Sequence, residues 1–228
     1  FAEKVFVSYK ELEGISVDYK NKVLEIGNLI REEIFSQKTS KDQSYEFNEL
    51  KILVLGGSQA AKIFADILPK IFEKLNDSKI IIKVYQQCLE EQNDKLSIFY
   101  KNAKIDFEIF NFTDKIVNYY TKANLVITRA GASVLGELIN FNIPFISIPL
   151  PSSADNHQLK NAEFYHRKGY GFLLEEKDVE QKLYDLIKSI FNDKFKINKI
   201  LSNQKQISDK DIFKNLNIQL EKIINEKN

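Results

Sequence analysis

Three short segments of the sequence combine small residues with hydroxyl, carboxyl or amide side chains. The first, Gly56-Gly57-Ser58-Gln59, follows an apolar run and precedes a helical pattern. Glycines permit positive φ angles and a close backbone approach, and the free N–H groups at a helix start attract anions. The segment therefore predicts a diphosphate site, although a tight turn capped by Ser58 accounts for the same residues. It lacks the GxGxxG pattern and the P-loop lysine, which disfavours an ordinary dinucleotide or ATP-hydrolysing site.

The second segment, from Thr128 to Ser133, also lies between a strand pattern and a helix pattern, and Glu137 follows it. Gly131 and its small neighbours would let a ligand reach the backbone, and Ser133 is expected to cap the helix. Glu137 lies about one turn into that helix, where a carboxylate can accept two hydrogen bonds from a ribose diol. The alternative is an exposed glutamate that stabilises the helix dipole.

The third segment begins at Pro149 and ends in Asp155, Asn156, His157 and Gln158. These donors and acceptors suit the recognition of sugar hydroxyls. Asp155 is also expected to cap the next helix, so a merely capped loop is the alternative. His157 has no cysteine, second histidine or acid at ligand spacing, so no metal site is expected.

Strand and helix patterns alternate along the chain and predict how the three segments are positioned. Strands are expected at residues 4–9, 23–26, 51–55, 80–85, 105–110, 124–128, 144–148 and 171–174. Helices are expected at 60–75, 113–123, 133–141, 155–168, 178–191 and 212–224, a loop at 10–22, and a linker or surface excursion at 36–49. This alternation predicts an α/β fold with a Rossmann-like, doubly wound parallel sheet. Such sheets bind ligands at the carboxyl ends of their strands, which is where all three segments lie.

The composition sets wider limits on the function. The chain has 228 residues, of which 43% are hydrophobic and 29% charged, as in a globular protein. A net charge of +1 gives no field that favours nucleic acid or an anionic membrane. The single Cys88 excludes an internal disulfide, and no apolar run reaches the ~18 residues of a membrane span. Because the sequence contains no methionine and begins with Phe1, we expect it to be part of a longer protein.

The three segments and their spacing make the sequence resemble the MurG family of glycosyltransferases over roughly residues 23–175. The matching positions are Gly27-Asn28 with Arg31, Leu55 to Gln59, Asn111 to Asp114, Arg129 to Ala132 with Glu137, Pro144, Pro149, Asp155 to Gln158, and Asn161-Ala162. The departures are Leu29 in place of a proline, Ala60 in place of a glycine, and Gln86-Gln87-Cys88 in place of a His-Gln-Thr-Gly-like turn.

The resemblance implies the C-terminal half of a GT-B glycosyltransferase. In that division residues 1–31 are the end of the N-terminal domain and the interdomain hinge, 32–193 the UDP-sugar-binding domain, and 194–228 a C-terminal helical tail. The implied activity is inverting hexosyl transfer of N-acetylglucosamine from UDP-N-acetylglucosamine to undecaprenyl-pyrophosphoryl-N-acetylmuramyl-pentapeptide (lipid I to lipid II) in peptidoglycan synthesis. No cofactor is implied. The implied location is peripheral, on the cytoplasmic face of the bacterial inner membrane, with the lipid-linked acceptor bound through a further N-terminal domain.

The resemblance also assigns donor-binding roles to nine residues. They are Arg31 and Ser58 at the diphosphate, Thr113 at the uracil edge, Ala132, Ser133 and Val134 near the phosphates and ribose, Glu137 on the ribose hydroxyls, and His157 and Gln158 on the hydroxyls of N-acetylglucosamine. The general base is expected in the further domain, so this chain alone is expected not to transfer sugar. Two alternatives stay open: a split or remnant nucleotide-sugar-binding module, and a GT-B nucleotide-sugar epimerase, which needs catalytic acids in both domains.

Overall fold

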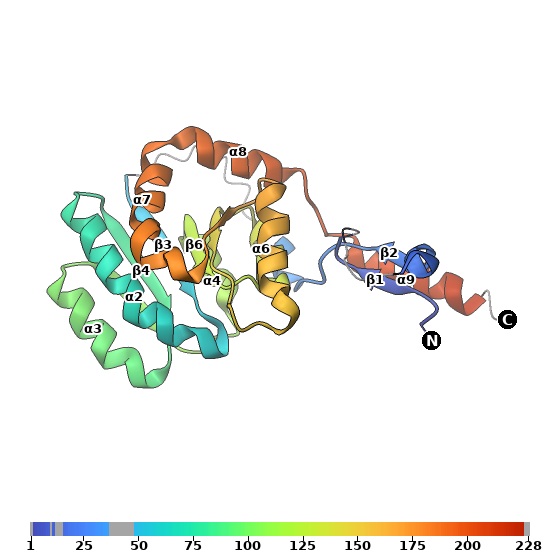
Figure 1. Cartoon of the computed structure of the whole chain (residues 1–228), viewed down its shortest axis with the longest axis horizontal. Coiled ribbons are helices and arrows are strands. Elements are labelled where there is room, and N and C mark those ends of the chain that lie inside the picture. Colours follow the sequence, from blue (N-terminus) through green and yellow to red (C-terminus); the bar gives the residue numbers. More distant parts are fainter. Residues whose placement is uncertain (1, 10, 12–15, 37–47, 226–228) are drawn as a thin grey trace.

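The main body of the molecule is a parallel β-sheet covered on both faces by helices, and a smaller unit projects from one end of it (Figure 1). The computed structural model describes residues 2–9, 11, 16–36 and 48–225, and at residues 58–61 it describes the backbone alone. The linker or excursion expected at 36–49 therefore falls almost wholly outside the described residues. In the described part of the chain, no helix is long and apolar enough to cross a membrane.

Six strands form the main sheet, in the order β5-β4-β3-β6-β7-β8, and every neighbouring pair is parallel. Their bounds are β3 (Leu50–Leu55), β4 (Ile82–Gln87), β5 (Asp106–Phe110), β6 (Leu125–Thr128), β7 (Phe145–Ser147) and β8 (Phe172–Leu173). The chain runs outward from β3 to β5 and then places β6 on the other side of β3. The predicted doubly wound sheet is confirmed, and the reversal between β3 and β6 is where such sheets bind ligands.

Alternate side chains of the strands face two separate cores. In β3, Ile52 and Val54 belong to one core and Leu53 and Leu55 to the other, because successive strand side chains point to opposite faces. The first core is closed by α2 (Gly57–Asp77), α3 (Asn93–Asn102) and α7 (Val179–Asn192), and the second by α1 (Glu33–Ser36), α4 (Ile116–Lys122), α5 (Ala132–Phe141) and α6 (His157–Arg167). Burial on both faces explains why the strands appear in the sequence as continuous apolar runs.

Three packed helices, α1, α3 and α8 (Lys194–Lys205), are missing from the sequence prediction. α3 buries only Leu96 and Tyr100 in ten residues, so its apolar period is too short to stand out. α8 lies in a sequence rich in lysine and asparagine, yet Ile197 and Leu201 belong to the first core. It contacts α7 in one helical layer and α5 in the other, and thereby ties the two layers together.

The smaller unit joins an early and a late part of the chain (Figure 1). β1 (Val5–Val7) and β2 (Val23–Glu25) pair in parallel, and α9 (Ile212–Asn225) shares with β2 the lining of a cavity of about 220 Å³. The predicted loop at 10–22 is wrong in part, because its second half forms the 3-10 helix η1 (Val17–Lys22). Other short 3-10 helices in the described connections are η2 (Glu90–Gln92), η3 (Ala154–Asn156) and η4 (Glu176–Asp178).

Candidate functional site

A cavity of about 410 Å³ opens at the carboxyl ends of β3 and β6, where the sheet order reverses. This volume lies in the usual range of small-molecule sites. The lining residues are Arg31, Leu55, Gly56, Gly57, Gln87, Phe112, Thr113, Ile116, Tyr120, Thr128, Arg129, Gly131, Val134, Glu137, Leu150 and Gln158. Parts of all three sequence segments thus meet at one cavity.

The first segment forms the start of α2 at the cavity wall. Gly56 holds the N-cap position, and Gly57 follows with a φ of +66°. A Cβ at Gly57 would be strained at this angle, although no described heavy atom lies within 4 Å of it. The position therefore needs glycine for its backbone and leaves room for a ligand. Because Ser58 lies after the N-cap, the predicted Ser58 cap is wrong; its side chain lies outside the described part of the structure.

The second segment forms the start of α5, so a second helix N-terminus meets the cavity. Gly131 holds the N-cap position, and the predicted cap by Ser133 is therefore wrong. Val134 lines the cavity, whereas Ala132 and Ser133 lie exposed on the first turn, outside the set of described lining residues. Two converging helix N-termini concentrate free N–H groups and positive dipole ends, which is the arrangement that binds phosphate groups.

The Glu137 carboxylate is buried, with both oxygens hydrogen-bonded. Arg31 Nε donates to Oε1 over 2.8 Å, and the Tyr120 hydroxyl donates to Oε2 over 2.9 Å. Glu137 is only 4% exposed, so the alternative of an exposed glutamate is wrong. Burial, and then the neighbouring carboxylate, raise the pKa of Tyr120 well above its usual range, so the phenol stays a donor. Each carboxylate oxygen keeps acceptor capacity for a ligand hydroxyl.

Two neighbouring residues after β5 form another part of the wall. The Thr113 side chain accepts a hydrogen bond from the backbone N–H of Lys115 over 3.1 Å, which fixes the turn there. Phe112 lines the cavity and is 91% exposed, so its ring face is open to a flat ligand group. Phe112 is among the positions at which the sequence resembles the MurG family, but that resemblance assigns it no ligand role.

The third segment places Gln158 in the cavity and His157 outside the described lining. Gln158 Oε1 accepts the backbone N–H of Leu150 over 3.0 Å, which leaves its amide NH₂ to donate to a ligand. His157 is exposed, and its Nδ1 lies 2.8 Å from the Ala154 carbonyl oxygen. Asn156 holds the N-cap of α6, so the predicted cap by Asp155 is wrong.

Arg129 is a buried cation in the cavity wall that the sequence prediction left without a role. Its Nη1 donates to the backbone carbonyls of Ile148 and Pro149, both over 3.2 Å. Its Nη2 pairs with Glu176 over 2.5 Å, and the guanidinium stacks 4.8 Å from the centre of the Phe64 ring. Arg129 thus ties the third segment to the end of β6. A charged residue directly after a buried strand was the signal in the sequence.

Metal ligands do not cluster in this part of the molecule. Within the described residues, no group of three or more His, Cys, Asp and Glu side chains is placed to hold a metal ion. The groups able to meet a ligand at the cavity are therefore helix N-termini, side chains that hydrogen-bond, and an aromatic ring.

Comparison with known protein families identifies the fold unit that holds this cavity. Residues 51–216 match the model of the glycosyltransferase family 28 C-terminal domain. The chain belongs to this family.

Two curated relatives of this family-28 chain share the name UDP-N-acetylglucosamine–N-acetylmuramyl-(pentapeptide) pyrophosphoryl-undecaprenol N-acetylglucosamine transferase. The Pelagibacter ubique protein is 34% identical over 230 residues, covering 99% of this chain and 63% of its own length. The Rickettsia bellii protein is 33% identical over 200 residues, covering 82% of this chain and 55% of its own length. The resemblance to the MurG family is confirmed, and the chain spans less than two thirds of these relatives.

Solved structures agree with the fold of this family-28 chain. MurG of Acinetobacter baumannii superposes with a TM-score of 0.68 at 20% identity, over 83% of this chain and 53% of that one. The S. aureus MnaA–UDP structure superposes with a TM-score of 0.66 at 16% identity, and the match covers 92% of this chain and 56% of that one. The predicted α/β fold of the GT-B type is confirmed by these likenesses.

Proposed function

We propose that this chain is the donor-binding part of an inverting transferase. The enzyme moves N-acetylglucosamine from UDP-N-acetylglucosamine to undecaprenyl-pyrophosphoryl-N-acetylmuramyl-pentapeptide. The observation that carries the proposal is the cavity at the sheet reversal, where two helix N-termini and a buried carboxylate converge. Those groups match a diphosphate and a ribose diol joined in one ligand. The names of the curated relatives supply the sugar and the acceptor.

The diphosphate is assigned to the starts of α2 and α5. Backbone N–H groups near Ser58, Ala132 and Ser133 would bind its oxygens, and they would stabilise the charge that grows as UDP leaves. The Arg31 side chain is 42% exposed beside the cavity, so the guanidinium can contact a phosphate while its Nε holds Glu137. These dipoles and charges are fixed before the ligand arrives, which is what lowers the barrier.

The nucleoside is assigned to the wall formed by Thr113, Val134 and Glu137. Glu137 accepts the ribose hydroxyls, and the backbone at Thr113 faces the uracil edge. Phe112 adds an apolar face beside the base, a contact that tolerates any flat ring. Selectivity for uracil therefore rests on the backbone hydrogen bonds at Thr113.

The sugar is assigned to the start of α6, where two side chains have complementary roles. Gln158 donates through its NH₂ group, since its oxygen already accepts from Leu150. His157 must carry its proton on Nδ1 to bind the Ala154 carbonyl, which leaves Nε2 as an acceptor for a sugar hydroxyl. One donor and one acceptor at the same helix end can form hydrogen bonds with two neighbouring sugar hydroxyls.

The rest of the reaction is assigned to a part of the enzyme beyond this chain. The general base and the binding site for the lipid-linked acceptor belong to a further N-terminal domain, and contact with the cytoplasmic face of the inner membrane is peripheral. Residues 1–31 form the end of that domain and the hinge, residues 32–193 the UDP-sugar domain, and residues 194–228 the helical tail. This chain alone binds donor without transferring sugar.

Calorimetric titration of the chain with UDP, UDP-N-acetylglucosamine, ADP and GDP tests the proposal directly. We expect the two uridine ligands to bind at least tenfold more tightly than ADP or GDP. A transfer assay with lipid-linked acceptor should show no turnover unless an N-terminal domain is added. Equal affinity for all nucleotides would contradict the donor assignment. Epimerisation of UDP-N-acetylglucosamine would favour the epimerase alternative.

A further inference from the structure

The N-terminal segment, described at residues 2–9 and Glu11, packs on the main body through the aromatic ring of Tyr9. This ring stacks on Phe164 of α6, with centroids 3.9 Å apart and planes 13° from parallel. The stack lies at the junction where the smaller unit meets the main body, beside a cavity of about 300 Å³ that Tyr9 and Phe164 both line.

The Tyr9 hydroxyl begins a chain of two hydrogen bonds that ends at the candidate site. It donates to Asn161 Oδ1 over 2.8 Å, and Asn161 Nδ2 donates to the Ala130 carbonyl over 3.1 Å. The Ala130 carbonyl can only accept, so the amide must present its NH₂ there and its oxygen to Tyr9. Ala130 directly precedes Gly131, the N-cap of α5 at the cavity wall.

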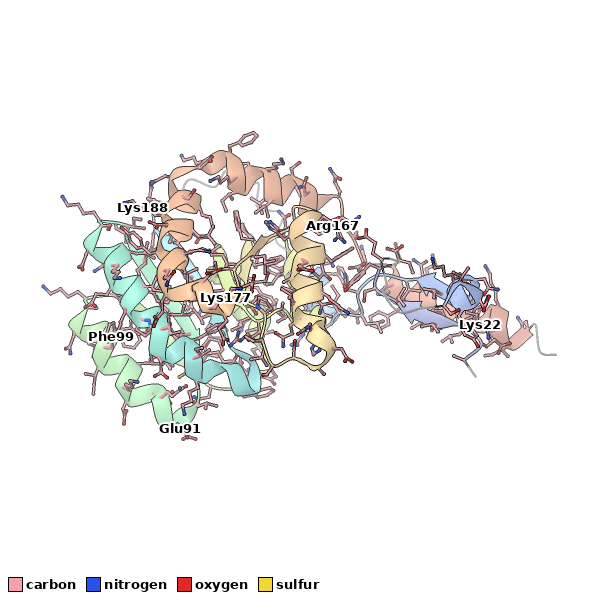
Figure 2. All side chains as sticks on the ribbon, in the orientation of Figure 1. Lys22, Glu91, Phe99, Arg167, Lys177 and Lys188 are labelled. Atoms are coloured by element: carbon pink, nitrogen blue, oxygen red, sulfur yellow. The ribbon has the colours of Figure 1, made fainter. Side chains whose placement is uncertain are left out.

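The far end of α6 is also attached to the N-terminal segment. Glu11 pairs with Lys168 over 2.7 Å and with Arg167, which lies on the side of α6 nearest the smaller unit (Figure 2). The two bases hold the pKa of Glu11 below its usual value. Exposed ion pairs add little stability, so these contacts orient the end of α6. Gln158 lies at the opposite end of the same helix, at the cavity.

We propose that Tyr9 is a positioning residue that sets the nucleotide affinity of the cavity through Asn161. The inference rests on the proposed function. Asn161 is 8% exposed and holds the loop between β6 and α5, while Tyr9 holds Asn161. A displacement of the N-terminal segment therefore reaches the phosphate-binding start of α5 through two hydrogen bonds. In the longer relatives, a change in how the preceding part of the chain packs against this segment would change donor affinity through the same two hydrogen bonds.

The first test is Tyr9→Phe, which keeps the ring on Phe164 and removes the hydroxyl alone. We expect UDP to bind about 3- to 10-fold more weakly, as for one lost hydrogen bond. The matched control is Tyr184→Phe on α7, whose hydroxyl lies 2.7 Å from Ser78. That variant should bind UDP like the wild type. Wild-type affinity in Tyr9→Phe would overturn the proposal.

The second test is a double-mutant cycle with Asn161→Ala. If Tyr9 acts through Asn161, adding Tyr9→Phe to Asn161→Ala should weaken UDP binding by less than about twofold. A role of Tyr9 through the Phe164 stack would instead leave the two effects additive. Full additivity would overturn the relay.

The third test needs no ligand and separates this inference from the proposed function. Hydrogen exchange of the backbone amides of residues 129–135 should be several-fold faster in Tyr9→Phe than in the wild type or Tyr184→Phe. If the wild type fails to bind UDP, the proposed function is contradicted, and exchange still decides the relay. Unchanged exchange in Tyr9→Phe would overturn it.

Discussion

A buried carboxylate is stable only when its oxygens find donors, and Glu137 finds them in Arg31 and Tyr120. Arg31 comes from the segment between β2 and α1, and Tyr120 from α4, so three separate elements meet at one side chain. Removing the carboxylate altogether would leave a buried phenol without its acceptor. A variant that tests the ligand role must therefore keep the side chain's shape.

Glu137→Gln meets that requirement, since it removes the charge and one acceptor while keeping the volume. We expect UDP affinity to fall about tenfold or more, because a hydrogen bond to a charged group contributes ~1.5–3 kcal/mol. Titration calorimetry measures the effect, and thermal unfolding confirms that the variant is folded. Glu90→Gln, at an exposed position, is the control and should bind like the wild type. Unchanged affinity in a folded Glu137→Gln would remove Glu137 from the ligand site.

At the level of elements, a glycine sets how closely α5 approaches the segment after β2. A Cβ at Gly136 would lie 2.8 Å from both Cβ and Cγ of Asn28. Asn28 is itself buried, accepting from Tyr165 and donating to Asp209. The close approach holds the segment after β2 against the helix that carries Glu137.

Gly136→Ala is therefore expected to destabilise the fold, although alanine in a helix interior is ordinarily better than glycine by ~1 kcal/mol. The new methyl group must displace a hydrogen-bonded asparagine, so we expect a net loss of about 1–3 kcal/mol. Denaturant unfolding gives the value. Gly131→Ala is the control, since its Cβ would meet no described heavy atom within 4 Å, and its loss should be clearly smaller. A Gly136→Ala variant more stable than the wild type would contradict this expectation, because it would show that Asn28 moves aside at little cost.

The sequence predicts the elements better than it predicts their contacts. β3 and β6 stand out because burial on both faces makes them continuous apolar runs, and the loops after them follow from the sheet rule. The predicted helix caps are wrong by one or two residues, because the N-cap positions belong to Gly56, Gly131 and Asn156. The partners of Arg129 and Glu137 depend on tertiary packing, which no local pattern contains. The ligand roles of the nine residues stay predictions until binding is measured.

At the scale of the whole molecule, buried tyrosines set a limit on stability at high pH. Burial raises the pKa of Tyr100, Tyr120 and Tyr165, and the Glu137 carboxylate adds to the effect at Tyr120. Burial also raises the pKa of the Cys88 thiol to about 11. All four groups therefore stay protonated in the folded protein at a pH where an unfolded chain would release their protons.

Stability is accordingly expected to be intact below about pH 8, to begin to fall at about pH 8.5–9, where unfolded Cys88 ionises, and to fall more steeply above about pH 10, where unfolded tyrosines ionise. Each fully protected group contributes a loss of about 1.4 kcal/mol per pH unit in that range. Urea unfolding at a series of pH values measures the slope, and tyrosinate absorbance should rise together with unfolding. Complete tyrosine ionisation in a chain that stays folded would contradict this account.

The pairing of β1 and β2 with α9 has a consequence for synthesis on the ribosome. β2 ends at Glu25 and α9 begins at Ile212, so the partners of one small unit emerge far apart in time. At ~5–20 residues per second, the intervening chain takes roughly 10–40 s to translate. During that interval Leu24 and Ile26 lack the helix with which they line the cavity of about 220 Å³. The smaller unit is thus completed only after the main body has been synthesised.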